Sequence, residues 1–432
     1  MKLNFVNYCS FLICLLPAAL ITGPLIPEII LLICNIFFLI RVVQEKNFKY
    51  FNNIFFKIFL VFWISLNILS LFSDYILYSL KYSFSYIRYG IFVLSIYYLI
   101  TNNKNFINNF YKSIIVTLLI LLFDSYFQYF FGFNIFGFNK PSDFMISSFF
   151  NDELILGTYL LRISPLLIAL YLFFIYKKNT KLNWFLFYIA IAFPIIFLSG
   201  QRTPFYLSIL FLLCSIIILK LDKYKFLSLV FALIIISTNI LMDQKKYVGA
   251  ATGYKGRMVS DIIYNYKKIP EYQEKQIQDY KYLKYFFISP SHNSLWFTAL
   301  ELYSENKLVG QGPNTFRKTC QNLKHEIQYS CSTHPHNYFF QLLSETGLIG
   351  TLIYIVIYLS ILKSFFIDYF NLNNNKKNLH LKTIIFLKLS LLINFVPLFP
   401  NGNFFNNHQN ILIFLPIGFL LYFLNIKKNG ND

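Results

Sequence analysis

The chain has few charged residues. Aspartate, glutamate, lysine and arginine make up 13% of its 432 residues, whereas hydrophobic residues make up 56%, and the mean hydropathy is +0.53. A soluble protein of this length has too little interior to hide that much apolar surface. The scarcity of charge therefore excludes a soluble globular fold and indicates a protein that is solvated largely by lipid.

Acidic residues are scarcer than basic ones. The chain has 19 Asp and Glu against 38 Lys and Arg, which gives a formal charge of +19 at pH 7. Such a charge would suit nucleic acid binding, but the basic residues stand in short clusters between apolar runs. That pattern is typical of the cytoplasmic loops of a membrane protein and not of a phosphate-binding stripe. We therefore expect membrane lipid, and no nucleic acid, among the partners.

Long hydrophobic runs take the place of charge. Windows long enough to span a bilayer, roughly 17–25 residues each, predict an all-α, polytopic transmembrane helix bundle of about 12 helices. The first window is followed at once by the second with no small-residue cleavage site, so we expect a retained helix and not a signal peptide. The windows are residues 5–22, 25–41, 54–73, 86–101, 112–131, 156–176, 184–199, 204–220, 225–241, 348–369, 382–399 and 409–425.

One long polar segment divides the chain into three parts. Residues 1–241 carry predicted helices one to nine, residues 242–336 form one large non-cytoplasmic loop, and residues 337–432 carry a re-entry helix and helices ten to twelve. Alternate short loops are enriched in Lys and Arg, which marks the cytoplasmic side. The pattern predicts that both termini are cytoplasmic and that the large loop lies on the other side.

Cysteine is also scarce, with six residues in the chain. There is no C-x-x-C pair and no local group of four His and Cys residues, so we expect no structural zinc site. Cys320 and Cys331 are the two cysteines of the large loop. In an oxidising compartment they can form a disulfide, and the alternative is a pair of free thiols.

The most polar chemistry stands where the large loop re-enters apolar sequence, in "CSTHPHNYFFQLLSETGLIG" from Cys331 to Gly350. His334 and His336 are two residues apart in this stretch. A neutral imidazole can take a proton from a hydroxyl near pH 7. His-x-His can instead bind a metal ion, but no third ligand stands at a recognisable spacing, so we expect no metal.

A plainer interpretation of this stretch is capping and packing. Asn337 suits the N-cap of the following helix, and Gln341 and Glu345 lie one turn apart on one face of it. Gly347 and Gly350 allow a turn and a close helix approach. This interpretation explains the asparagine and the glycines, but it leaves the two histidines without a role.

Arginines provide the second signal. Arg202 stands in "LSGQRTPFYL", a short turn on the same predicted side as the histidines. It either reaches for lipid headgroups or binds phosphate oxygens, which a guanidinium holds bidentately. Arg317, in "LVGQGPNTFRKTC", and Arg257, in "YKGRMVSD", are weaker candidates for a second phosphate contact. The two glycines before Arg317 do not form a P-loop, because the terminal Lys-Ser/Thr is missing.

Together these features resemble the O-antigen ligase and polymerase superfamily, bacterial membrane glycosyltransferases with one large periplasmic loop before a late helix. The histidine signature of its ligases is His, then Asn, Ser or Gln, nine residues, and Gly-x-x-Gly. His336 and Asn337, nine residues and then Gly347 to Gly350 match that signature.

Two further stretches resemble the superfamily with departures. The arginine signature is Arg-x-x-x-Leu, whereas Arg202 meets Leu207 one place later. The segment "HNSLWFTALELYSENKLVGQGPNTFR" is similar to a Trp…Leu…Gly-x-Gly…Phe stretch of the superfamily. Many members have an arginine four residues before that Trp, and here the position is His292.

The resemblance implies a metal-independent, inverting glycosyltransferase without a cofactor in the bacterial inner membrane, with its active site on the periplasmic side. It implies a glycan donor on undecaprenyl diphosphate and, as acceptor, lipid A–core or another glycan. The implied catalytic residues are His336, His334 and Glu345, and Arg202 with Arg317 or Arg257 would hold the diphosphate. The implied supporting residues are Asn337, Gln341, Gly347, Gly350 and His292.

The function that we expect is an O-antigen ligase-like transfer. One alternative is an O-antigen or polysaccharide polymerase that uses the same donor. A second alternative is a flippase or transporter of lipid-linked glycans. A transporter is expected to place ionisable residues within its spans, and we expect these spans to be nearly free of charge.

Overall fold

The computed structural model describes residues 2–142, 145–178, 183–220, 290–323, 330–374 and 378–428. Within these residues the protein is helical, and the only extended pairings are two isolated β-bridges. The all-α expectation is confirmed. The longer helices are α1 (Lys2–Ala19), α2 (Leu25–Glu45), α3 (Ile54–Ser70), α4 (Ile76–Ser85), α5 (Ile87–Asn102), α6 (Phe106–Phe131), α7 (Leu156–Lys178), α8 (Asn183–Leu198), α9 (Arg202–Leu219), α12 (Pro290–Glu305), α14 (Tyr338–Asn374), α15 (Leu379–Asn394) and α16 (Asn407–Lys428).

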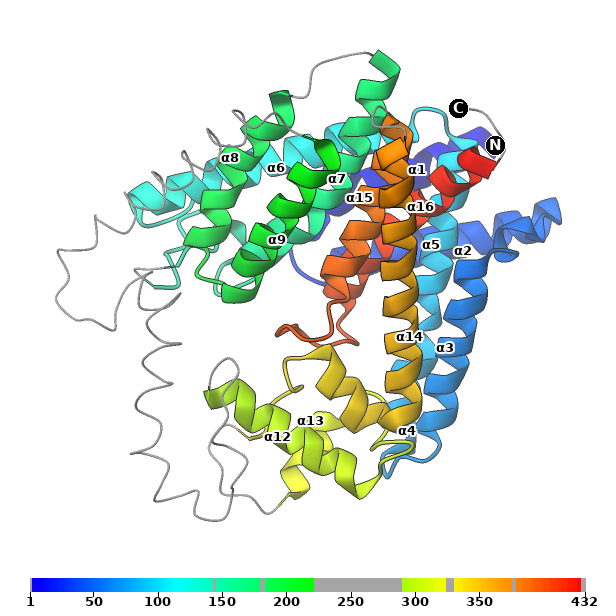
Figure 1. Cartoon of the computed structure of the whole chain (residues 1–432), viewed down its shortest axis with the longest axis vertical. Helices are drawn as coiled ribbons and strands as arrows, with labels where there is room; N and C mark the ends of the chain where they lie inside the picture. Colours follow the sequence, from blue (N-terminus) through cyan, green and yellow to red (C-terminus); the bar gives the residue numbers. More distant parts are fainter. Residues whose placement is uncertain are drawn as a thin grey trace.

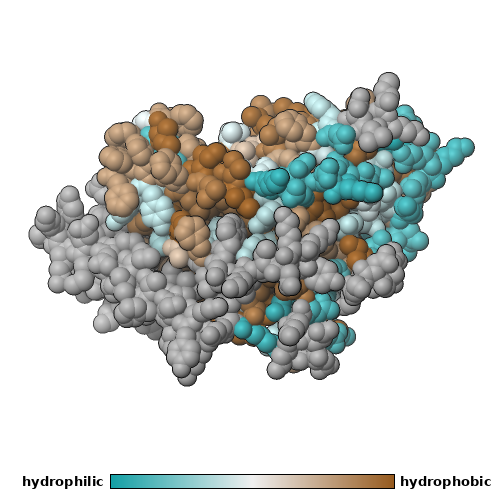
Figure 2. Space-filling model, turned by 90° about the horizontal axis from the view of Figure 1, so that it is seen from above, coloured by the Kyte–Doolittle hydropathy of each residue, from teal (hydrophilic) through white to brown (hydrophobic). Residues whose placement is uncertain are grey.

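Length and composition make the protein a multi-pass membrane protein. Seven stretches of the described residues are long and apolar enough to cross a bilayer. Exposed apolar side chains recur along their outer faces, as on α2, where Ile29, Ile33, Ile36 and Ile40 are all exposed. This three-to-four-residue recurrence puts one apolar helix face outward, as a lipid-facing helix requires. Hydrophobic residues also cover a large part of the surface in the view of Figure 2.

The helix at the centre of the bundle is α15. All of its residues from His380 to Asn394 are buried, and it packs against α7, α9, α14 and α16. It ends at Asn394, five residues earlier than the predicted window, and Pro397 and Pro400 follow. The residue before a proline is disfavoured in helical conformation, which explains the early end.

Other predicted elements differ at their edges. Helix α4 was not expected, and it runs almost directly into α5 at Tyr86. Helix α6 begins at Phe106, earlier than its predicted window. The predicted span 225–241 and the first part of the large loop, to residue 289, lie outside the described residues.

The expectation that the spans are nearly free of charge is wrong. Lys388 of α15 forms a buried ion pair with Asp368 of α14, with 2.5 Å between Nζ and Oδ2. Arg88 of α5 pairs with Glu28 of α2 at 2.7 Å. Arg162 of α7 is also buried. Each of these charges stands alone among apolar residues, so the surrounding window is apolar in spite of it.

The described end of the large loop forms a small helical unit beside the start of α14 (Figure 1). Helix α12 and the short α13 (Phe316–Thr319) share a small core with Trp296, Phe316 and Cys320 among its members. The ring of Trp296 stacks on Phe340 of α14 with 4.8 Å between centroids. A disulfide joins Cys320 to Cys331, with 5.4 Å between their Cα atoms. In Figure 1 this unit lies at the end of the bundle opposite to both termini.

Candidate functional site

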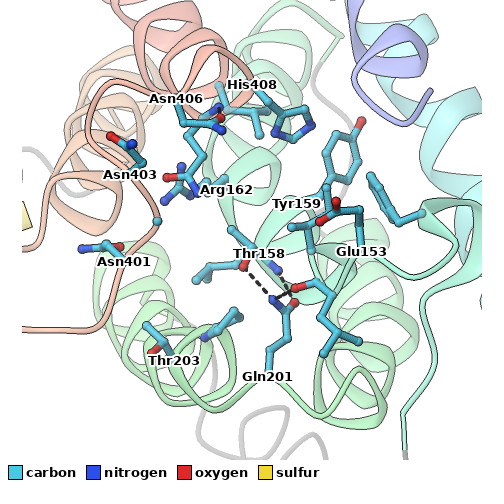
Figure 3. Close-up of a pocket in the computed structure, with 18 of the residues that line it drawn as sticks. Glu153, Thr158, Tyr159, Arg162, Gln201, Thr203, Asn401, Asn403, Asn406 and His408 are labelled. Atoms are coloured by element: carbon cyan, nitrogen blue, oxygen red, sulfur yellow. Dashed lines mark hydrogen bonds between the residues drawn. The ribbon is translucent and has the colours of Figure 1, made fainter. Parts of the chain in front are cut away.

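A cavity of about 1490 Å³ lies between the starts of α7, α9 and α16 and the loop segments that flank α12 and α14. Segments from the whole length of the chain meet there, from Thr22 after α1 to His408 in α16. Figure 3 shows the polar side chains around it. The polar and charged side chains of its wall include Glu153, Thr158, Arg162, Gln201, Arg202, His292, His334, His336, Asn401, Asn403, Asn406, His408 and Gln409.

Three histidines cluster at this cavity. The ring centroids of His334 and His336 are 4.0 Å apart, and those of His292 and His336 are 5.8 Å apart. His292 comes from the first turn of α12 and the other two from the segment before α14. The structure therefore brings together the two predicted catalytic histidines and the histidine at the position of the superfamily's arginine.

All three imidazoles are held in their neutral form. Burial lowers the pKa of His336 below its ordinary value. Burial, with His336 as the next cause, lowers the pKa of His334 to about 3. Burial, followed by His336 and Arg202, lowers the pKa of His292 to about 4. A neutral imidazole can accept a proton, so the cluster has the protonation state that a general base needs at neutral pH.

The backbone holds His336 in an unusual conformation. Its φ is 54°, in the left-handed region that non-glycine residues rarely adopt. Its carbonyl accepts a 2.8 Å hydrogen bond from Asn401 N. Asn337 caps α14, because its Oδ1 accepts hydrogen bonds from Phe339 N and Phe340 N at 2.9 and 3.1 Å. A strained residue that its neighbours hold on both sides is a mark of functional sites.

Glu345 does not lie beside the histidines. Its carboxylate accepts hydrogen bonds from Asn314 N at 2.9 Å, from Phe316 N at 3.0 Å and from Gln341 Nε2 at 3.2 Å. Gln341 also donates to Asn403 Oδ1 at 2.9 Å. The predicted one-turn pairing of Gln341 and Glu345 is present, but this carboxylate fixes the loop before α13 and not the tautomer of an imidazole.

The glycines allow two backbones to meet. Gly347 interrupts α14 with φ 60° and ψ −161°, and a Cβ there would lie 2.4 Å from the carbonyl oxygen of Leu308. The broken turn of the helix bonds to the neighbouring loop, where Gln311 N donates to Ser344 O and Leu348 N donates to Lys307 O, both at 2.9 Å. Gly350 follows within α14, where a Cβ would meet the side chain of Thr346.

Arg202 is the first residue of α9 and lines the cavity. The residue before it pins α9 to the start of α7. Gln201 accepts a 3.0 Å hydrogen bond from Thr158 N, and its Nε2 donates to Thr158 Oγ1 at 3.1 Å and to Leu154 O. Figure 3 shows these bonds. The start of a helix carries unpaired N–H groups and a partial positive charge, so this end of α9 suits an anion.

The other two predicted arginines do not join the site. Arg317 is exposed in α13, and it is not part of the cavity wall. Its neighbour Lys318 lies over the ring of Tyr78, 4.4 Å from the centroid, which places this turn against α4. Arg257 lies outside the described residues. The structure instead puts Arg162 and His408 in the cavity wall, and neither was expected there.

An amide-rich loop completes the wall. Asn401, Asn403, Asn406 and Gln409 all line the cavity, and they come from "FPNGNFFNNHQ", which follows α15 and ends in the first turn of α16. Tyr338 Oη donates a 2.9 Å hydrogen bond to Gln409 Oε1 and thereby ties this loop to the start of α14. Amide groups both donate and accept hydrogen bonds, so they suit sugar hydroxyls.

Metal binding was weighed for the His-x-His pair. Within the described ranges, no three His, Cys, Asp or Glu side chains form a group that could hold a metal ion. The rings of His292 and His336 meet edge to face with 71° between their planes, and those of His334 and His336 are tilted by 47°.

A comparison with protein families identifies the segment that carries this site. The family model described as O-antigen ligase matches residues 187–355. This match supports the O-antigen ligase superfamily for the segment that carries the site. A search of curated proteins finds no match.

The O-antigen ligase segment runs from α8 into α14 and contains Arg202 and the three clustered histidines. The match supports a ligase- or polymerase-type function in general, with glycosyltransferase-like enzyme activity. Arg162 and the amide-rich loop lie outside the matched residues but line the same cavity. The cavity is therefore built jointly by the family segment and by the rest of the bundle.

Proposed function

We propose that the protein transfers a glycan from undecaprenyl diphosphate to a sugar hydroxyl of lipid A–core, at the periplasmic face of the bacterial inner membrane. One observation carries this proposal: Arg202 and the three histidines, which are up to 134 positions apart in the sequence, line one cavity at the end of a membrane bundle. A cation and a neutral base in one cavity are what a diphosphate donor and a hydroxyl acceptor require.

In the proposed reaction His336 acts as the base. It takes the proton from the acceptor hydroxyl, whose oxygen attacks the anomeric carbon of the donor. The bond from that carbon to the diphosphate oxygen breaks, and the electron pair leaves with the diphosphate. Attack from the opposite side inverts the anomeric centre. The fixed cation Arg202 stabilises the leaving charge, so the scheme is metal-independent and needs no cofactor.

The neighbours of His336 are proposed as positioning residues. His334 packs against its ring, and Asn337 caps the helix that follows it. Gln341 and Glu345 fix the loops on either side of α14. The amide-rich loop is proposed to bind glycan hydroxyls. This division leaves His336 as the one proton acceptor that we place at the reacting atoms.

The sequence argument against a flippase is that a transporter needs ionisable residues within its spans, where few were expected. That argument fails, since the spans hold the buried pair of Lys388 and Asp368, the half-buried pair of Arg88 and Glu28, and the buried Arg162. The family match favours the enzyme over the flippase, because that family implies glycosyltransferase-like activity. The polymerase alternative shares the donor and the cavity and differs in the acceptor.

Deletion of the gene in its own host tests the proposal. Lipopolysaccharide is compared on a gel with the pool of glycan on undecaprenyl diphosphate, and the wild-type gene is restored as a control. A ligase predicts loss of the whole ladder while full-length chains accumulate on the carrier lipid. Loss of long chains with one repeat still attached to core would show a polymerase. An unchanged ladder and pool would contradict both.

A further inference from the structure

The buried guanidinium of Arg162 lacks a counter-ion among the described residues. The residue is 5% exposed, and its Nη1 is buried without a hydrogen-bond partner. Its one side-chain hydrogen bond within the described chain runs from Nη2 to Tyr338 Oη at 3.5 Å, the limit of such a bond. A buried cation without a partner is costly, so we expect this charge to have a function.

Among the described residues, the buried Arg41 and Lys388 and the half-buried Arg88 have acidic partners, whereas the buried Lys382, which lies outside the cavity, has no ion pair. Arg88 has Glu28 and Lys388 has Asp368. Arg41 has Glu45, with 2.7 Å between Nη2 and Oε1. A guanidinium cannot lose its proton, so burial cannot neutralise Arg162 as it neutralises the histidines. The missing partner must therefore be an anion that enters the cavity.

The position of Arg162 relates this anion site to Arg202. Thr158 and Arg162 are one helical turn apart, so they share a face of α7, and both line the cavity. Thr158 is bonded to Gln201, whose neighbour is Arg202. Figure 3 shows Arg162 and Gln201 on the same cavity, joined through the Thr158 turn. The two arginines thus face one space from helices that are fixed to each other.

The depth of Arg162 sets how a lipid-linked phosphate reaches it. It lies six residues after the start of α7, about 9 Å along the helix axis at 1.5 Å per residue. That is inside the hydrocarbon thickness of about 30 Å and below the level of the lipid phosphates, so a lipid-linked phosphate reaches Arg162 by entering the cavity. A carboxylate or sugar acid would satisfy one cation, but two arginines on one cavity suit a group with two negative charges close together.

We propose that Arg162, with Arg202, forms the binding site for the diphosphate of the lipid-linked donor and of the lipid diphosphate that leaves. This rests on the proposed function for the identity of the donor. Arg162 is thus the second diphosphate-binding arginine, a role that the resemblance assigned to Arg317 or Arg257.

The test uses the full-length protein in phosphatidylcholine nanodiscs, with inorganic pyrophosphate and geranyl diphosphate as probes. Thermal unfolding is followed for the wild type, Arg162→Met and Arg162→Lys. Arg162→Met removes the uncompensated charge, so without a probe it is expected to unfold a few degrees higher than the wild type. It is also expected to bind both diphosphates at least about tenfold more weakly, the loss of a charged hydrogen bond. Arg162→Lys keeps the positive charge but loses the bidentate geometry of the guanidinium, so it should bind diphosphate with intermediate strength.

A matched control separates an anion site from a structural arginine. Arg41→Met breaks a paired arginine about 25 Å along α2 from the cavity loop that precedes this helix, at 1.5 Å per residue. It should unfold at a lower temperature and bind diphosphate as the wild type does. An Arg162→Met protein that also unfolds at a lower temperature and still binds diphosphate like the wild type would overturn the proposal.

Two further arms identify the anion and the dependence on function. Phosphatidylglycerol in the nanodisc is compared with pyrophosphate. If it stabilises the wild type as much as pyrophosphate does, and does not stabilise Arg162→Met, the site binds a lipid headgroup and the proposal fails. If Arg162→Met loses diphosphate binding but His336→Ala still transfers glycan, the anion site stands and the proposed base is wrong. If His336→Ala loses transfer but Arg162→Met binds diphosphate normally, the function stands and this inference is wrong.

Discussion

At the scale of single residues, what matters is the protonation state that the fold imposes. His336, His334 and His292 are all shifted toward the neutral form, and burial is the leading cause for each. Arg162 and Arg202 keep their charge in the same cavity because a guanidinium does not titrate in proteins. The cavity thus holds neutral bases beside cations, because burial lowers the pKa of the histidines and leaves the arginines charged.

This predicts the pH dependence of transfer. The base must be neutral, and the pKa of His336 lies below its ordinary 6.5. The maximal transfer rate should stay level from pH 8 to 6.5 and fall only at lower pH, as His336 gains a proton. His334 and His292, with pKa values of about 3 and 4, stay neutral throughout that fall. A rate that already halves above pH 6.5 would contradict the assignment. The measurement is the transfer rate at saturating donor between pH 5 and 8.

The residue scale is also where sequence reasoning was weakest. The histidines and Arg202 could be found because polar residues at the edge of apolar runs stand out. Arg162 gave an equally plain signal, an arginine inside an apolar window, which marks a functional site by default. The apolar residues around Arg162 nevertheless make the window 156–176 apolar as a whole, so Arg162 was not predicted as a site residue. The place of Glu345 could not be predicted, since its partners Asn314 and Phe316 come from a loop with no periodic pattern.

At the scale of elements, the interruption of α14 organises the site. Gly347 lets the helix bend away from the bundle so that its first turns carry Asn337 and Gln341 toward the amide-rich loop. The backbone groups that lose their helix partners at this interruption form hydrogen bonds with the backbone of residues 307–312. The sequence predicted a turn and a close approach at this glycine, but it could not predict that the partner is Leu308.

Substitution of Gly347 tests this arrangement. Gly347→Ala places a Cβ 2.4 Å from Leu308 O in a conformation that only glycine adopts readily, so we expect a loss of stability of about 1–3 kcal/mol. The measurement is thermal unfolding of the purified protein in detergent. Leu352→Ala is the matched control, because Leu352 is an exposed side chain of the same helix and should change stability by at most about 0.5 kcal/mol. Equal unfolding temperatures for the two variants would contradict the structural role of Gly347.

Helix existence was easier to predict than helix ends. Spans such as α2, α3 and α9 follow directly from their apolar windows, because the bilayer demands a minimum apolar length. The unexpected helix α4 has the sequence "ILYSLKYSFS", whose serines bind the loop that precedes α13. Those serines made the segment look like a polar connection. The hydrogen bonds of Ser79 to Pro313 O and of Ser79 and Ser83 to Ser70 of α3 exist only in the folded protein.

At the scale of the whole molecule, the cavity depends on parts that the family segment does not contain. Residues 187–355 supply the histidines and Arg202, while α7 supplies Arg162 and the loop before α16 supplies the amides. The all-α membrane class followed from composition alone. The joining of these parts around one space could not, because it depends on which helices pack against α15, and nearly uniform apolar faces do not specify that.

The measurement that tests the account most directly is glycan transfer by the purified protein. Wild type and His336→Ala are compared in nanodiscs with a glycan on undecaprenyl diphosphate and lipid A–core as acceptor. His380→Ala is the control, because this histidine lies in the first turn of α15 and outside the cavity. The account predicts that His336→Ala lowers the transfer rate by about 10²–10⁴-fold, the usual contribution of a general base, while His380→Ala transfers glycan at the wild-type rate. Wild-type transfer by a folded His336→Ala protein would contradict it.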